Sequence, residues 1–123
     1  MIIGIGCDII EVDRVRRAIE RDSFKQRVFT AAETAYCESR GKQGAASFAA
    51  RFAVKEAVLK ALGTGLRGGA LTEIEVTNDE LGKPCVKLSG YHGEMAARLG
   101  VRQLHVSISH SRDNAMAYII MEG

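Results

Sequence analysis

The sequence predicts a single α+β domain, residues 1–123, in which an antiparallel sheet packs on one long helix. Residues 44–62 contain no proline and are rich in Ala, Leu, Lys and Glu, which favour a helix. Segments with alternating apolar residues gather in the second half of the chain, whereas helical patterns dominate the first half, as in α+β proteins. The length of 123 residues, with 46% hydrophobic and 26% charged, is typical of one globular domain.

The composition argues against several classes of protein. A net charge of +2 is too small to indicate a nucleic-acid partner, and no apolar run approaches the ~18 residues that a membrane span needs. The apolar N-terminus soon reaches Asp8 and Glu11, so no signal peptide is expected. The three cysteines are odd in number and widely spaced, unlike a disulfide framework or a zinc site. We therefore expect a cytoplasmic protein without nucleic-acid or membrane partners.

A short buried strand is expected at residues 1–7, ending at Asp8. Its isoleucines are β-branched, and Gly4 and Gly6 allow another backbone to approach closely. Cys7 is expected to be a small core residue. The run Gly4-Ile5-Gly6 is part of a dinucleotide-binding fingerprint, but no third glycine follows at the required spacing. The strand is therefore not interpreted as a nucleotide-binding turn.

An amphipathic helix is expected at residues 11–21, with Val12, Val15 and Ile19 on one face. Its opposite face carries four arginines, which are Arg14, Arg16, Arg17 and Arg21. On composition alone, a solvated face explains these charges. The alternative is a docking surface for an acidic partner, because a helix displays arginines as a stripe.

The middle of the chain predicts two further helices. Thr30-Ala-Ala-Glu33 is a capping box, so a helix is expected from Thr30 to about Ser39. After a loop at residues 41–44, the long helix runs to Leu62, and Gly63 ends it in left-handed backbone. The long helix should bury one apolar stripe, formed by Phe48, Phe52, Lys55 and Leu59.

The last half of the chain predicts a hairpin, a helix and two more strands. A Gly-rich loop at residues 65–70 comes first, and it lacks the Gly-Lys-Ser/Thr ending of a Walker loop. The elements expected after it are strands at 71–77 and 85–88 around a turn at 81–84, a helix at 89–99 capped by Ser89 and stopped by Gly100, and strands at 104–109 and 115–121.

Asp8 and Glu56 are carboxylates near the ends of apolar elements, where burial alone disfavours charge. If the first strand packs beside the long helix, they can meet and hold a hard cation such as Mg²⁺. Lys60, one turn after Glu56, would then face the phosphates of a substrate. By itself, however, a Glu-x-x-x-Lys pair is more often an ordinary helix salt bridge worth ~0.2–0.5 kcal/mol. His110 would bind phosphate or move a proton near neutral pH, although an isolated histidine is more often structural or solvent-exposed.

Four motifs occur in one order along the chain. They are Ile3-Gly-Ile-Gly-Cys-Asp8-Ile-Ile, Arg51-Phe-Ala-Val-Lys-Glu56-Ala-Val-Leu-Lys60-Ala-Leu-Gly-Thr-Gly65, Gly82-Lys-Pro84 and Val106-Ser-Ile-Ser-His110. Together they resemble the short bacterial type of the 4′-phosphopantetheinyl transferase family, the holo-acyl-carrier-protein synthases. The resemblance covers essentially the whole chain, and its pairing of Gly-x-Asp with Lys-Glu-Ala-x-x-Lys is specific.

The resemblance implies a Mg²⁺-dependent enzyme that transfers the 4′-phosphopantetheine group of coenzyme A to a serine of apo acyl carrier protein. The other product would be adenosine 3′,5′-bisphosphate, and the reaction would support fatty acid biosynthesis. The resemblance also implies a homotrimer with each site at a subunit interface.

Individual residues match positions of this family. Asp8 and Glu56 match the Mg²⁺ ligands and, with Lys60, the catalytic positions. The positions that match the coenzyme A site are Lys60, Gly63, Thr64 and Gly65 around the phosphates, and Arg51, Ser109 and His110 in the nucleotide-binding neighbourhood. Arg14 and Arg21 match the helix that docks the acidic carrier protein.

Several alternatives stay open on the residues alone. The proton of the acceptor serine would go to Glu56 directly or to a Mg²⁺-bound water. A different Mg²⁺-dependent nucleotide or phosphate enzyme would use the same carboxylates and Lys60. A non-catalytic module would use only the basic helix to capture an acidic protein, and such a module has no need of Asp8 with Glu56 and Lys60.

Overall fold

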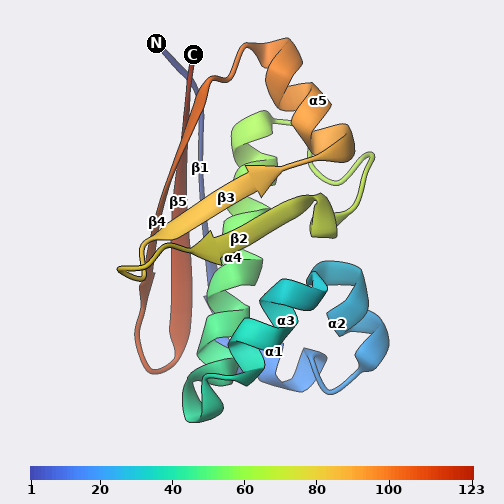
Figure 1. The fold of residues 1–123 in the computed structure, drawn as a ribbon, viewed down its shortest axis with the longest axis vertical. Coiled ribbons are helices and arrows are strands. Elements are labelled where there is room, and N and C mark those ends of the chain that lie inside the picture. Colours follow the sequence, from blue (N-terminus) through green and yellow to red (C-terminus); the bar gives the residue numbers. More distant parts are fainter.

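The long helix α4 (Gly44–Leu62) stands at the centre of the computed structural model, which describes residues 1–123 (Figure 1). A three-stranded antiparallel sheet covers one side of α4, in the order β1-β5-β4. The hairpin β2–β3 crosses its other side. The strands are β1 (Ile2–Glu11), β2 (Ile74–Asn78), β3 (Pro84–Leu88), β4 (Gln103–His110) and β5 (Asn114–Glu122).

The shorter helices lie around this core. Helices α1 to α3 pack together near the N-terminal end of α4, and α5 lies near its C-terminal end (Figure 1). Their bounds are α1 (Val12–Ala18), α2 (Asp22–Val28), α3 (Ala31–Glu38) and α5 (Gly90–Leu99), with the short 3₁₀ turns η1 (Gly41–Gln43) and η2 (Leu71–Glu73). The predicted α+β class, with an antiparallel sheet on a long helix, is confirmed.

The sheet has one buried and one exposed face. On β1, alternate residues from Gly4 to Ile10 face α4, opposite the buried Ala115, Ala117 and Ile119 of β5. The residues between them point away from the protein. The outer face therefore exposes a row of large apolar side chains, namely Ile5, Ile9, Tyr118 and Ile120.

Two glycines let β1 lie directly against the backbone of α4. A Cβ atom on Gly6 would sit 2.0 Å from the carbonyl oxygen of Ala57, and one on Gly4 would sit 2.2 Å from that of Ala61. No side chain fits at such distances. The close approach expected from Gly4 and Gly6 is therefore present, and Asp8 follows them on the same face of the strand.

The long helix differs from the prediction in how much of it is buried. Helix α4 begins and ends where expected, and Gly63 stops it with a φ of 76°. Its burial is not limited to one stripe, because the sheet packs on one side and the hairpin on another. Phe52 of the expected stripe is only half-buried, whereas Lys55 is fully buried.

Other boundaries also differ from those predicted. Strand β1 continues past Asp8 to Glu11, because its last residues pair with the start of β5. The predicted helix at 11–21 ends at Ala18, and a separate helix, α2, follows it. Residues 71–73 form a 3₁₀ turn before β2 begins.

Two predicted caps had different outcomes. The capping box of Thr30 and Glu33 is confirmed, with both of its hydrogen bonds present. Ser89 does not cap α5 with its side chain, because its hydroxyl lies 3.5 Å from the carbonyl oxygen of Glu73 instead. Gly100 stops α5 in left-handed backbone, as predicted.

Candidate functional site

Asp8 and Lys60 meet where β1 passes α4. Lys60 Nζ donates to Asp8 Oδ1 over 3.1 Å and to the carbonyl oxygen of Cys7 over 3.0 Å. The Asp8 side chain is only 15% exposed, and its second oxygen, Oδ2, is buried without a hydrogen-bond partner. Cys7 itself is exposed, so the expectation of a core cysteine was wrong; its side chain lies on the outer face of the sheet.

The charges of Asp8, Glu56 and Lys60 act on one another. Burial raises the pKa of Glu56, the Asp8 carboxylate raises it further, and Lys60 opposes the shift. The hydrogen bond and the charge of Asp8 raise the pKa of Lys60. A carboxylate whose ionisation is disfavoured by a neighbouring carboxylate marks a place where a cation is stabilised. The convergence of Asp8 and Glu56 that the sequence suggested is therefore present.

The donor set fits a hard divalent cation such as Mg²⁺. Asp8 Oδ2 is a buried carboxylate oxygen with no partner, and a polar atom of this kind is costly unless something binds it. No group of three or more His, Cys, Asp or Glu side chains is gathered in the structure. Mg²⁺ commonly takes only one or two protein carboxylates, with waters and substrate phosphate as its other ligands.

A pocket of about 360 Å³ adjoins these groups. It is lined by Glu56, Leu59, Lys60, Gly63, Gly65 and Leu66. Left-handed backbone at Gly63 and Gly65, with φ of 76° and 60°, turns the chain around its edge. Thr64, between these glycines, donates its hydroxyl hydrogen to the carbonyl oxygen of Gly65. The predicted phosphate-binding loop thus lies beside Lys60 and Glu56.

Arg51 and His110 line a different pocket, of about 250 Å³. The Arg51 guanidinium is almost fully buried; its Nη2 donates to Asn78 Oδ1 over 2.7 Å, and its Cζ lies 4.4 Å from the centre of the Tyr36 ring. The other residues of this pocket include Tyr36, Arg40, Ser47, Gly82 and Pro84. The Gly82-Lys-Pro84 motif therefore belongs to this pocket, whereas Tyr36, Arg40 and Asn78 carried no sequence signal.

Ser109 and His110 line a third hollow, of about 230 Å³, with Ile9, Ser111, Asn114 and Met116. Ser109 pairs with Met116 on the outer face of the sheet. Within one chain, the predicted site residues thus form two groups that share no pocket. Asp8, Glu56, Lys60 and the Gly63–Gly65 loop form the first group; Arg51, Ser109 and His110 form the second.

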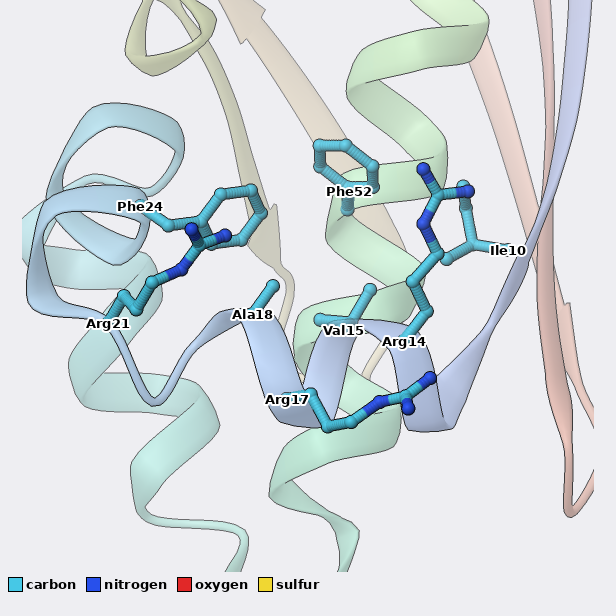
Figure 2. Close-up of a pocket in the computed structure, with 8 residues that line it drawn as sticks. All are labelled: Ile10, Arg14, Val15, Arg17, Ala18, Arg21, Phe24 and Phe52. Atoms are coloured by element: carbon cyan, nitrogen blue, oxygen red, sulfur yellow. The ribbon is translucent and has the colours of Figure 1, made fainter.

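Helix α1 and the turn that follows it border a hollow of about 450 Å³. Figure 2 shows Arg14 and Arg21 on opposite sides of it, with Phe24 and Phe52 between them. The remaining lining residues are Ile10, Val15, Arg17 and Ala18. Arg16 is not among them, because it pairs with Asp13 at the surface. Three of the four predicted arginines therefore frame one concave surface with an apolar floor.

Residues 4–119 match the family described as the 4′-phosphopantetheinyl transferase superfamily. The chain belongs to this superfamily, which confirms the resemblance drawn from its motifs. A relative from Clostridium tetani, named "Holo-[acyl-carrier-protein] synthase", is 52% identical over 100% of this chain and 98% of its own length.

Solved structures agree with this assignment. The holo-[acyl-carrier-protein] synthase of Neisseria meningitidis superposes with a TM-score of 0.90 at 32% identity, over 100% of both chains. The enzyme of the same name from Bacillus anthracis was solved in complex with CoA (3′,5′-ADP). It superposes with a TM-score of 0.81 at 37% identity, over 98% of this chain and 96% of its own.

None of the helices here is both long and apolar enough to span a membrane.

Proposed function

We propose that this protein transfers the 4′-phosphopantetheine group of coenzyme A to a serine of an apo acyl carrier protein. The observation that carries the proposal is the meeting of Asp8, Glu56 and Lys60 beside the Gly63–Gly65 loop. Phosphoryl transfer depends mainly on alignment and on offsetting phosphate charge, and these groups supply both. Relatives named holo-[acyl-carrier-protein] synthase support the same reaction.

In the proposed reaction, the serine Oγ forms a bond to the pyrophosphate phosphorus that carries the pantetheine arm. The bond from that phosphorus to the bridging oxygen breaks, and adenosine 3′,5′-bisphosphate leaves. Glu56 accepts the serine proton and later releases it to solvent. In the metal-free protein, burial and the neighbouring Asp8 raise the pKa of Glu56, and a more basic carboxylate is a better proton acceptor.

Asp8 and Glu56 are the residues that would hold Mg²⁺. When bound, the ion supplies positive charge that offsets the negative charge of the pyrophosphate oxygens. Lys60 contributes a fixed ammonium at the same place, because its hydrogen bonds to Asp8 and Cys7 hold the side chain over the pocket. The Gly63–Gly65 loop, with Thr64, would lie against the pyrophosphate.

The second group of residues would bind the nucleotide part of coenzyme A. Arg51 and His110 supply cationic or donor groups for its phosphates, with Ser109 beside them. Since one chain keeps this group apart from Glu56 and Lys60, a site that joins both groups needs a second copy. We place each site between subunits of a homotrimer.

The outer face of the sheet supports this assembly. It exposes Ile5 (67%), Ile9 (63%), Tyr118 (53%) and Ile120 (40%) on adjacent strands. A contiguous apolar patch of this kind is typical of an interface rather than of a solvated face. Ser109 lies on the same face, so packing of a second copy there would bring that copy to the nucleotide-binding group.

The hollow framed by Arg14 and Arg21 would dock the carrier protein. Its arginines match an acidic surface, and its floor of Phe24 and Phe52 offers apolar contact area. Of the two interpretations of these arginines, a solvated face or a docking surface, we therefore propose the docking surface. The setting we propose for the reaction is the cytoplasm, as part of fatty acid biosynthesis.

The test is the intact mass of a purified apo acyl carrier protein after incubation with this protein, coenzyme A and Mg²⁺. We expect a gain of one phosphopantetheine, roughly 340 Da from its covalent formula, and loss of that gain in EDTA. An unchanged mass with wild-type protein, coenzyme A and Mg²⁺ all present would refute the proposed reaction on that acceptor.

A further inference from the structure

Lys55, the residue before Glu56, lies in a buried network of hydrogen bonds. Its side chain is fully buried. The Lys55 Nζ donates to Glu33 Oε1 (2.8 Å) and to the carbonyl oxygens of Leu71 (2.9 Å) and Ile74 (2.5 Å). These three acceptors match the three donors of an ammonium group. The cation is therefore fully satisfied without any contact with solvent.

Glu33 satisfies the other half of the network. Its Oε1 also accepts a hydrogen bond from the Thr30 amide (2.9 Å), and its Oε2 accepts one from the Val76 amide (2.8 Å). The carboxylate thus joins the start of α3 to β2, and the ammonium joins α4 to the segment between the Gly-rich loop and β2. One ion pair therefore holds together three parts of the chain that lie far apart in sequence: the start of α3, the middle of α4 and residues 71–76.

Stability alone does not account for such a pair. Removing two charges from water costs several kcal/mol, and replacing a buried ion pair with apolar groups is often neutral or stabilising. What a fully bonded pair provides in addition is one defined arrangement, since its acceptors have fixed positions. The network therefore fixes one packing arrangement of α4 against the hairpin β2–β3.

The packing of α4 against the hairpin directly affects the geometry of the transfer site. Glu56 follows Lys55 in α4, so the turn of the helix that buries Lys55 also sets the direction of Glu56. Leu71 directly follows the Gly-rich loop, whose first residue, Gly65, lines the pocket of Glu56 and Lys60 together with Gly63. One turn before Lys55, Arg51 bonds to Asn78 of the same hairpin, so α4 is held there at two successive turns.

We propose that Lys55 and Glu33 are positioning residues of the transfer site. They keep Glu56 directed at Asp8 and fix the far end of the Gly-rich loop. The inference rests on the proposed function for its catalytic consequence, but its structural consequence can be measured separately.

The test is the double variant Lys55→Met with Glu33→Gln, which removes both charges together and leaves neither one buried alone. Initial rates are measured well below the unfolding temperature and are normalised to the folded fraction. We expect kcat to fall about ten- to a hundred-fold, since a shift near 1 Å at a reacting group costs about that much. The KM for the carrier protein should stay within about twofold of the wild-type value, because neither Lys55 nor Glu33 lines the hollow framed by Arg14 and Arg21.

Hydrogen exchange supplies the structural readout. In the double variant, amides of residues 63–76 should exchange at least about tenfold faster, while amides of β1 and β5 keep their rates. The matched control is Lys25→Met with Glu38→Gln, which removes an exposed ion pair of the same chemistry (2.9 Å). The control should leave exchange in residues 63–76 unchanged.

The outcomes separate the two proposals. Wild-type protein that modifies the carrier, together with a folded double variant of unchanged kcat, would overturn the positioning role alone. Wild-type protein that does not modify the carrier would overturn the proposed function, and local exchange would still test the network. Exchange that rises equally throughout the variant would mean that the pair serves only overall stability.

A measurement on the wild type covers the case in which the double variant fails to fold. The Val76 amide donates to Glu33 Oε2, so it should exchange as slowly as the central amides of α4. Exchange of Val76 orders of magnitude faster than α4 would show that the network does not hold the hairpin to the helix, and would overturn the proposal.

Discussion

Replacing Gly6 with alanine should separate the two carboxylates of the site, because no methyl group fits between β1 and α4. The new Cβ would lie 2.0 Å from the carbonyl oxygen of Ala57 and 2.9 Å from the amide nitrogen of Ala61. Both neighbours are backbone atoms of a buried helix, so neither can rotate away. Ordinary contact begins at 3.4 Å, so β1 must retreat by roughly 1 Å or more.

The expected cost follows from this displacement. Overpacking a core costs ~1–3 kcal/mol, and a rigid backbone contact places Gly6→Ala at about 3 kcal/mol. The midpoint of thermal unfolding should fall by about 10 °C in a chain of this size. Asp8 lies two residues after Gly6 on the same face of β1, so it moves with the strand. A shift near 1 Å should lower kcat by about a hundred-fold, even in protein that remains folded.

The assay is the intact-mass assay of carrier-protein modification, run beside thermal unfolding. The matched control is Gly93→Ala in α5, where the new Cβ would meet its nearest atoms at 3.4 Å and where alanine favours the helix. This control should keep wild-type kcat and an unfolding midpoint no lower than that of the wild type. Wild-type kcat and an unchanged midpoint in Gly6→Ala would refute the account of how β1 positions Asp8.

Three further predictions concern charge and assembly. Glu56→Gln should lower turnover by about a hundred-fold or more yet raise the unfolding midpoint of the metal-free protein at neutral pH. The reason is that the raised pKa of Glu56 lets the folded wild type keep a proton that the unfolded chain has lost. The contribution of Glu56 to the stability of the wild type therefore falls as the pH rises from 4.5 through the raised pKa. A stability difference between variant and wild type that does not grow over this pH range would contradict the shift. Arg14→Glu should raise the KM for the carrier protein by about tenfold, more at low salt, with coenzyme A affinity unchanged; Arg98→Glu on α5 is the control of equal charge change. Wild-type protein should sediment at three times its 13.3 kDa chain mass, and Ile5→Glu on the outer face should yield monomers, whereas a monomeric wild type would rule out the trimer.

Much of the local structure was predictable because its signals are short-range. The capping box at Thr30, the left-handed glycines at residues 63 and 100, and the turn before Pro84 each act within a few residues. Those signals located α3, α4, α5 and the hairpin. What short-range signals missed was α2 and the continuation of β1 past Asp8, since the latter depends on pairing with a strand more than a hundred residues away.

In the candidate site, too, some features were predictable from the sequence and others depend on tertiary contacts. The sequence carries Asp8, Glu56 and Lys60 as motif residues, and it indicates that two carboxylates could meet. It does not reveal that Asp8 Oδ2 is buried without a partner, or that Arg51 is held between Tyr36 and Asn78. These facts depend on which surfaces of α4 are covered, and by what.

By itself, the sequence determined the class of fold and the family, and it predicted the residues that we propose carry the chemistry, because helix ends, turns and motif spacing are local properties of the chain. Tertiary structure alone decided that the backbone approached by Gly6 is that of α4 and that the partner of Lys55 is Glu33. It also decided that Arg51 and His110 line a different pocket from Glu56. The physical reason is that packing distances and burial arise only when segments distant in sequence exclude water from between them.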